Sequence, residues 1–203
     1  MNVEEIFLKR GAIHFSFEKP FTWASGIESP VYCDNRKLIS YPKDVKFLTK
    51  ELSKIILKHF SGVQALAGTA TAGIPWSSFL SYEMNLPNSY IRGGTSKGHG
   101  LKKQVEGDLK PGAKVVIVED LVSTGKSSLE AYHAAKDFGL EVLGIMSLMT
   151  YGLEQSKSAF KKQSIQYHSL TNIHQVMDYA VKAGDIEKEK ATALDGFLDK
   201  LNS

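Results

Sequence analysis

The chain has 203 residues and a formal net charge of +3, from 25 basic and 22 acidic side chains. This length predicts one domain, residues 1–203, and the nearly balanced charge without a long basic run disfavours nucleic-acid binding. No apolar stretch reaches the length of a membrane span. The lone Cys33 excludes an intrachain disulfide, and a charged N-terminus does not resemble a secretory signal. We therefore expect a cytoplasmic protein that binds neither nucleic acid nor membrane.

The first 40 residues predict a small segment outside the main sheet. Residues 2–10 have an N-cap candidate, early acids and late bases, which favours a short helix. Residues 12–22 alternate loosely and predict a strand. Residues 21–40 contain a glycine, a proline and aromatics without a helical period. Composition leaves two interpretations of them open: an irregular or hairpin cap over the sheet, or a hood that closes on a flat ligand through Tyr32.

Strands and helices then alternate from residue 64 to residue 170, which predicts an α/β domain with a parallel sheet of about five strands. The expected strands are residues 65–67, 87–91, 115–118, 141–150 and 165–169, and the expected helices are residues 41–60, 76–84, 129–138 and 153–162. Two helices, residues 172–183 and 187–201, close the chain. The predicted organisation is thus a hood segment (1–40), an α/β core (41–170) and C-terminal helices (171–203).

Two loops of this alternation have compositions that suit an anion. Residues 68–75, GTATAGIP, are nearly all small, so a ligand could approach the backbone closely. Such a loop is usually only a tight crossover. Residues 92–103 combine four glycines with Arg92, Lys97 and His99. By itself this segment is typical of a solvated basic loop, but phosphate loops on either side would favour an arm that closes on an anion.

The most informative stretch is VVIVEDLVSTGKSS, residues 115–128. Val115–Val118 predict a strand buried on both faces. Glu119 and Asp120 follow, and Ser123–Ser128 then open a helix. Ligands of open parallel sheets bind outside the carboxyl ends of the strands, and a helix N-terminus suits a phosphate. Because carboxylates accept hydrogen bonds from sugar hydroxyls, the stretch predicts a site for a phosphorylated ribose.

Two other interpretations of this stretch are weaker. A Walker nucleotide loop requires a glycine where Asp120 stands, and a carboxylate there would repel a phosphate. A purely structural turn would use Thr124 or Ser127 as an N-cap, with Glu130 completing a capping box. That turn accounts for the small polar residues but not for two adjacent acids near a core, where unpaired charge is costly.

Four apolar residues, two acids, Leu121-Val122 and the small loop Ser123–Ser127 resemble the ribose-phosphate signature of type I phosphoribosyltransferases. These enzymes bind 5-phosphoribosyl-1-pyrophosphate (PRPP). The resemblance implies their parallel-sheet α/β fold, with a small hood subdomain formed mainly by the N-terminal segment. FTWASGIESPVYCDNR (21–36), ALAGTATAGIP (65–75), and YIR with KGHG (from residues 90 and 97) resemble the hood, pyrophosphate loop and catalytic loop of the branch that acts on orotate.

The resemblance assigns roles to particular residues. The catalytic residues would be Lys97, Glu119 and Asp120. PRPP would be bound by Thr71, Ala72, Arg92, Lys97, His99, Glu119, Asp120, Leu121, Val122, Ser123, Thr124, Gly125, Lys126 and Ser127. Orotate would be bound by Tyr32, Arg36 and Ser123. The assembly would be a homodimer in which loop 92–103 reaches the neighbouring site.

The implied reaction transfers ribose 5-phosphate from PRPP to N1 of orotate, giving orotidine 5′-monophosphate and diphosphate in pyrimidine biosynthesis. Mg²⁺ usually keeps several waters and binds substrate phosphates, so we expect the substrate and water to hold it rather than a protein cage. The sequence departs from the pattern at several positions. The Arg92–Lys97 spacing is one residue longer, and Gly93, Ala24, Ala72, Thr150 and Tyr151 stand where some members carry basic residues.

Two rival functions remain at this stage. A related transferase acting on a purine or on uracil is disfavoured by the hood. A PRPP-sensing regulator that binds nucleic acid is disfavoured by the near-neutral charge and by Lys97 and His99 in a glycine-rich loop.

Overall fold

The computed structural model describes residues 2–23, 26–94 and 104–202. The helices are α1 (Val3–Lys9), the 3₁₀ helix η1 (Asn35–Ser40), α2 (Pro42–His59), α3 (Gly73–Met84), α4 (Lys126–Asp137), α5 (Glu154–Lys162), α6 (Ile173–Ala183) and α7 (Lys188–Asn202). The strands are β1 (Ile13–Phe15), β2 (Phe21–Thr22), β3 (Glu28–Ser29), β4 (Val31–Cys33), β5 (Ala65–Thr69), β6 (Asn88–Ile91), β7 (Val105–Glu106), β8 (Lys114–Val122), β9 (Glu141–Thr150) and β10 (Tyr167–Asn172).

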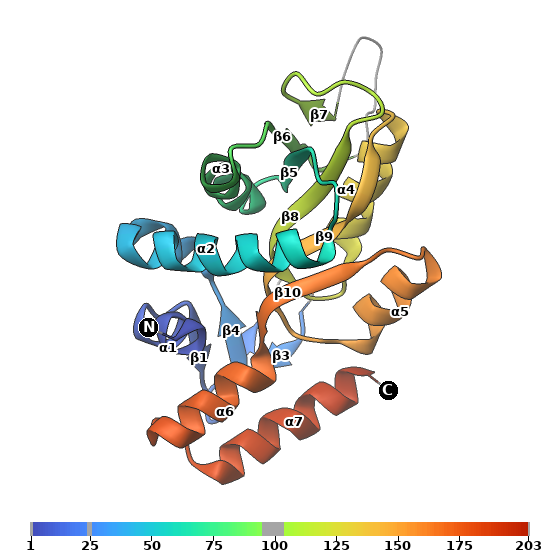
Figure 1. Ribbon diagram of the computed structural model, residues 1–203. Coiled ribbons are helices and arrows are strands. Elements are labelled where there is room, and N and C mark those ends of the chain that lie inside the picture. The colour runs from blue at the N-terminus through green and yellow to red at the C-terminus, as the bar shows by residue number, and fades with distance from the viewer. Residues whose placement is uncertain (1, 24–25, 95–103, 203) are drawn as a thin grey trace.

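The main sheet has the strand order β10-β9-β8-β5-β6-β7. The pairs from β10 to β6 are parallel, whereas β7 is antiparallel to β6 at the edge. This confirms the predicted α/β class and the parallel sheet, and adds β7, which the sequence pattern did not indicate. Figure 1 shows β7 at one end of the molecule and α6 and α7 at the other.

Alternate residues of β8 face two separate hydrophobic clusters, as expected for a strand covered on both faces. Val116 and Val118 pack in the cluster that contains Leu52 of α2 and Leu80 of α3. Val115 and Ile117 pack in the second cluster, with the alanines of α4 and with Phe160 of α5. Both faces of the central strand are therefore dry, and a ligand can reach β8 only at its end.

The N-terminal segment forms a small β-structured unit beside the sheet. β1 pairs with β4 and β2 with β3, both antiparallel. The prediction of one strand over residues 12–22 is wrong, because residues 16–20 separate β1 from β2. The 3₁₀ helix η1 was also not predicted. Phe7 of α1 shares a core cluster with Val176 of α6 and Leu194 of α7, so the C-terminal helices pack with the N-terminal segment. The division at residues 40 and 170 stays a prediction.

Several element boundaries differ from the predicted ones. The strand 141–150 is confirmed, but α3 begins at Gly73 rather than at residue 76, and α4 at Lys126 rather than at residue 129. β8 continues through the acidic pair to Val122 instead of ending at residue 118. Within the described residues, no helix combines the length and apolar composition that crossing a membrane requires.

Candidate active site

The acidic pair lies inside the last part of β8 rather than after it. β5 pairs with β8 only as far as Val118. On the other side β9 continues, with Glu119 opposite Ser147 and Leu121 opposite Met149. The predicted order of strand, acids and loop is corrected accordingly: one-sided pairing with β9 extends the strand through both acids. Glu119 and Asp120 thus stand at a step in the sheet, where the pairing of β8 with β5 has stopped.

Glu119 is buried, with 5% of its surface exposed, and is surrounded by hydroxyl donors. Thr69 at the end of β5 donates its hydroxyl to Oε1 at 2.6 Å. Ser127 and Ser128 in the first turn of α4 donate to Oε2, each at 3.3 Å. This carboxyl group therefore connects the end of β5 to the start of α4, and both of its oxygens already accept hydrogen bonds from the protein.

Asp120 is half-buried and lies next to Glu119. Burial and, to a lesser extent, the neighbouring charge of Asp120 raise the pKa of Glu119 to about 7. Burial also raises the pKa of Asp120, while hydrogen bonds from Glu119 and backbone N–H groups partly oppose this. Glu119 is thus the carboxyl that holds a proton more readily, and Asp120 is the more accessible anion of the pair.

The loop after β8 leads into a helix whose N-terminus carries no side-chain cap within the described residues. Gly125 is the N-cap residue and has φ +81°, and a Cβ there would press on the ring of Phe160. The cap by Thr124 or Ser127 that the purely structural interpretation would use is not found among the described residues, and the Ser127 hydroxyl donates to Glu119. The first N–H groups of α4 lack intrahelical partners, so they suit an anion.

A second uncapped helix N-terminus lies beside the acidic pair. α3 begins after Ala72, again with no side-chain cap within the described part of the chain. A Cβ on Gly73 would overlap the Val118 carbonyl oxygen and the Thr69 hydroxyl, so only glycine lets α3 approach β8 this closely. Thr71 and Ala72 therefore lie at the same edge of the sheet as residues 119–127, as the strand pattern predicted.

The basic residues predicted for the pyrophosphate are described only in part. Arg92 is exposed just after β6, and its Nη1 lies 3.3 Å from Oε1 of Glu106 in β7. Its backbone N–H donates to the Gln104 carbonyl, which holds the two ends of the predicted arm together. Lys97 and His99 lie outside the described residues, so their predicted roles stay predictions.

A pocket of about 420 Å³ lies between the N-terminal segment and the end of β8. Tyr32 and Ser123, both predicted to bind orotate, line it together with Leu121. Trp23 and Tyr151, which the sequence pattern did not mark as pocket residues, also line it and stack at 4.9 Å between ring centroids. The structure thus brings the predicted hood and the ribose-phosphate loop together around one cavity with flat apolar walls.

Arg36, the third residue predicted to bind orotate, is not among the described residues that line this pocket. Its side chain is exposed, and its Nε donates to Oδ1 of Asp34 at 2.6 Å. The Arg36 guanidinium holds the pKa of Asp34 below its usual range. Its nearest acidic partner is therefore on its own segment, and this pair uses only the Nε of the guanidinium.

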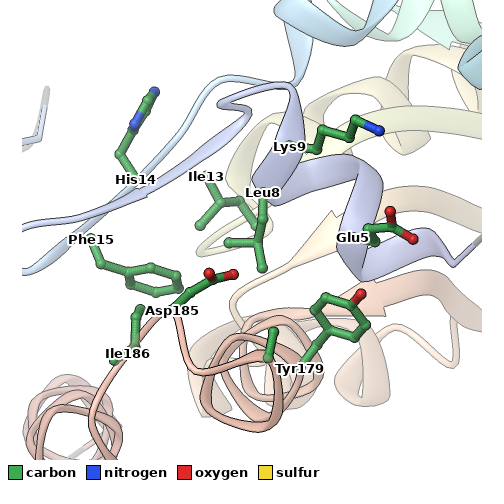
Figure 2. Close-up of a pocket in the computed structure, with 10 residues that line it drawn as sticks. Glu5, Leu8, Lys9, Ile13, His14, Phe15, Tyr179, Asp185 and Ile186 are labelled. Atoms are coloured by element: carbon green, nitrogen blue, oxygen red, sulfur yellow. The ribbon is translucent and has the colours of Figure 1, made fainter.

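A larger hollow of about 550 Å³ lies elsewhere, between α1, β1 and the end of α6. Figure 2 shows Leu8, Ile13 and Phe15 around it, with the carboxyl group of Asp185 between Phe15 and Leu8. None of the residues predicted for the site lines it. Cavity volume alone would therefore select a hollow that none of the predicted site residues lines. The acidic pair and the starts of α3 and α4 indicate the end of β8 instead.

Comparison with known proteins places this geometry in context. A family model described as a phosphoribosyl transferase domain matches residues 42–183, so the match begins after the N-terminal segment. The orotate phosphoribosyltransferase of Phocaeicola vulgatus is 46% identical over 193 residues, which are 95% of this chain and 91% of that protein. The UMP synthase structure from Leishmania donovani aligns with a TM-score of 0.84 and 30% identity, covering 98% of this chain and 42% of that one. The orotate phosphoribosyltransferase structure from Aeropyrum pernix has a TM-score of 0.77 and 27% identity, covering 88% and 97%.

Proposed function

This chain belongs to the orotate phosphoribosyltransferases, and on that premise we propose that the ends of β5 and β8 form its active site. The enzyme transfers ribose 5-phosphate from PRPP to N1 of orotate, with release of diphosphate. The observation that carries the assignment of the site is the placement of Asp120. It lies in β8 between Glu119, which contacts the end of β5 and the start of α4, and Leu121, which lines the apolar pocket.

The two acids take different roles in this proposal. Asp120 accepts hydrogen bonds from the ribose hydroxyls, which its half-buried position at the strand end supports. Glu119 acts through the protein, because its oxygens already accept from Thr69, Ser127 and Ser128. It holds the pyrophosphate loop and the ribose-phosphate loop at a fixed separation. The negative charge of Asp120 also favours the positive charge that develops on the sugar as diphosphate leaves.

The phosphates are assigned to the two loops. The first N–H groups of α4, with residues 123–127, bind the 5-phosphate, and Lys126 adds a positive charge there. Thr71 and Ala72 bind the pyrophosphate from the start of α3. Arg92, Lys97 and His99 neutralise the leaving diphosphate when the arm 92–103 closes, and closure excludes the water that would hydrolyse PRPP.

Mg²⁺ is assigned mainly to the substrate and to water. Among the described residues, no three or more His, Cys, Asp and Glu side chains gather into a metal cluster. The oxygen donors near the site fit this hard cation, but Glu119 is occupied by hydroxyl groups, which leaves Asp120 as the one available carboxylate of the pair. When bound, Mg²⁺ neutralises charge on the diphosphate.

The orotate ring is assigned to the pocket between Tyr32 and Ser123. The stacked pair Trp23–Tyr151 provides a rigid apolar wall for a flat ring, and Ser123 provides a hydroxyl that can hydrogen-bond to its polar edge. Trp23 is itself held by a 2.9 Å hydrogen bond from its Nε1 to the Val31 carbonyl. Tyr151 occupies part of the region where some members of the family carry an arginine.

A homodimer, with the arm of one chain completing the other's site, is the proposed assembly. An apolar surface supports self-association: Ile39, Phe79 and Tyr82 gather over a pocket of about 410 Å³ between η1, α2 and α3, and Tyr82 is 92% exposed. A large exposed apolar side chain in such a patch is typical of an interaction site. The free, buried thiol of Cys33 supports a reducing cytoplasmic location.

The experiment that tests the function is an absorbance assay of orotate consumption with PRPP and Mg²⁺. Uracil, adenine and hypoxanthine serve as parallel substrates, because the pocket is proposed to select the orotate ring. PRPP-dependent loss of orotate, absent without Mg²⁺, is the expected result. Turnover of a purine with orotate inert would overturn the assignment.

A further inference from the structure

Asn35 is a buried amide that joins the hood to the acidic end of β8. It begins η1 and only 1% of its surface is exposed. Its Nδ2 donates to the main-chain carbonyl of Asp120 at 2.7 Å, across 85 positions of sequence. Its Oδ1 accepts a hydrogen bond from the Cys33 Sγ at 3.1 Å. Since both ends of the amide have partners, its orientation is determined.

The Asp120 carbonyl needs this donor because β5 ends too early to provide one. Two residues before, the Val118 carbonyl oxygen lies 3.2 Å from the Thr69 hydroxyl oxygen at the end of β5, so it is on the β5 side of β8. Carbonyl directions repeat every second residue in a strand, so the Asp120 carbonyl lies on the same edge of β8. The register between β5 and β8 stops at Val118. The Asn35 amide therefore takes the place of the missing strand at the step in the sheet.

The same hydrogen bond connects the two walls of the base pocket. Cys33, two residues before Asn35, lines the pocket from the hood, and Leu121, directly after Asp120, lines it from β8. The peptide group that begins with the Asp120 carbonyl also sets the direction in which the chain enters the loop at Ser123. One contact thus relates the position of the base to the position of the ribose.

We propose that Asn35 is a positioning residue of the transfer reaction, which it serves by holding the Asp120 carbonyl and so aligning the hood with the ribose site. This rests on the proposed function of the site. Asn35 itself touches neither substrate. Binding groups for PRPP and orotate remain in place without it, but the alignment of N1 with the ribose C1 is lost. Misalignment of reacting atoms lowers the rate of the chemical step more than it weakens binding.

The first test compares Asn35→Ala with Ser29→Ala in steady-state kinetics. Ser29 is a matched control, because it is a fully buried polar residue whose hydroxyl bonds to Val31, within the same segment. Asn35→Ala is expected to lower kcat by about tenfold or more, with the KM of orotate and of PRPP changed by less than about threefold. Ser29→Ala is expected to lower the melting temperature without this loss of kcat.

Wild-type enzyme assayed in parallel distinguishes a failure of the proposed function from a failure of the positioning role of Asn35. An inactive wild type would contradict the proposed function, whereas an active wild type with normal kcat in Asn35→Ala would contradict the positioning role alone. A kcat loss that merely follows the folded fraction measured by thermal melting, as in the Ser29 control, would contradict it as well.

Asn35→Asp provides a second test that keeps the size of the side chain. Its ionised carboxylate cannot donate to the Asp120 carbonyl, but the protonated form can. The charged and titratable groups near this position are Cys33, Asp34, Arg36, Glu119 and Asp120. The ratio of variant to wild-type kcat is expected to rise as the pH is lowered. A ratio that stays near one at every pH would show that the donor has no role in the reaction.

Discussion

Replacing Glu119 by glutamine is expected to make the protein more stable than the wild type above neutral pH. Glu119 is 5% exposed, and burial together with Asp120 raises its pKa from 4.5 to about 7. An ionised carboxylate at this place is therefore costly to the folded state. Glutamine has nearly the same shape and can still accept from the Thr69 hydroxyl, but it carries no charge at any pH.

The size of the effect follows from the two pKa values. Because the folded-state pKa is the higher one, the folded state keeps its proton in a range where the unfolded chain has lost it. The stabilisation is complete below pH 4.5 and disappears as the pH rises to about 7. At about 1.4 kcal/mol per pKa unit this amounts to about 3 kcal/mol. The wild type should lose this stability over that window, and Glu119→Gln should not.

The assay is denaturant unfolding of both proteins from about pH 4 to about pH 9, and the quantity compared is the difference in the free energy of unfolding. Taking the difference cancels groups common to both proteins, such as His168, whose lowered pKa acts in the opposite direction. The two proteins should be about equally stable at the acidic end, with the variant ahead at the basic end. A difference that does not change with pH would show that Glu119 is ionised throughout and that its burial is compensated by the surrounding hydroxyl groups.

The remaining predictions concern activity and assembly. Asp120→Asn should lower kcat by more than about tenfold without lowering the melting temperature, and unchanged turnover would remove Asp120 from the ribose site. Lys97→Ala should lower kcat by more than about tenfold, equivalent to about 1.4 kcal/mol of transition-state stabilisation, and should change the KM of PRPP less. Lys97→Arg should restore only part of the rate. A raised KM with normal kcat would mean that Lys97 only holds the substrate. Mixed Lys97→Ala and Asp120→Asn chains should regain activity through one intact shared site, and no recovery despite confirmed subunit exchange would place the arm in its own subunit. Tyr82→Asp should shift a dimer to monomers in sedimentation velocity, and an unchanged sedimentation coefficient would move the interface elsewhere.

The amino-acid sequence by itself determined the α/β class, most of the sheet and the place of the site. The continuous apolar run 115–118 predicts a strand covered on both faces, and Gly73 marks where two backbones approach closely. These signals are local, so they can be read without a partner segment. The same is true of the acids at the end of a buried strand, which indicated the ligand edge of the sheet.

Only the tertiary structure distinguished the two acids from each other. In sequence Glu119 and Asp120 are equivalent neighbours, but the early end of β5 and the start of α4 bury one under hydroxyl groups and leave the other accessible. The stacking of Trp23 on Tyr151 and the bond from Asn35 to Asp120 likewise join segments far apart in the chain. Such contacts depend on where β5 ends relative to β8 and on how the hood meets the sheet. No periodicity or local propensity encodes these relations, because they arise from packing between elements.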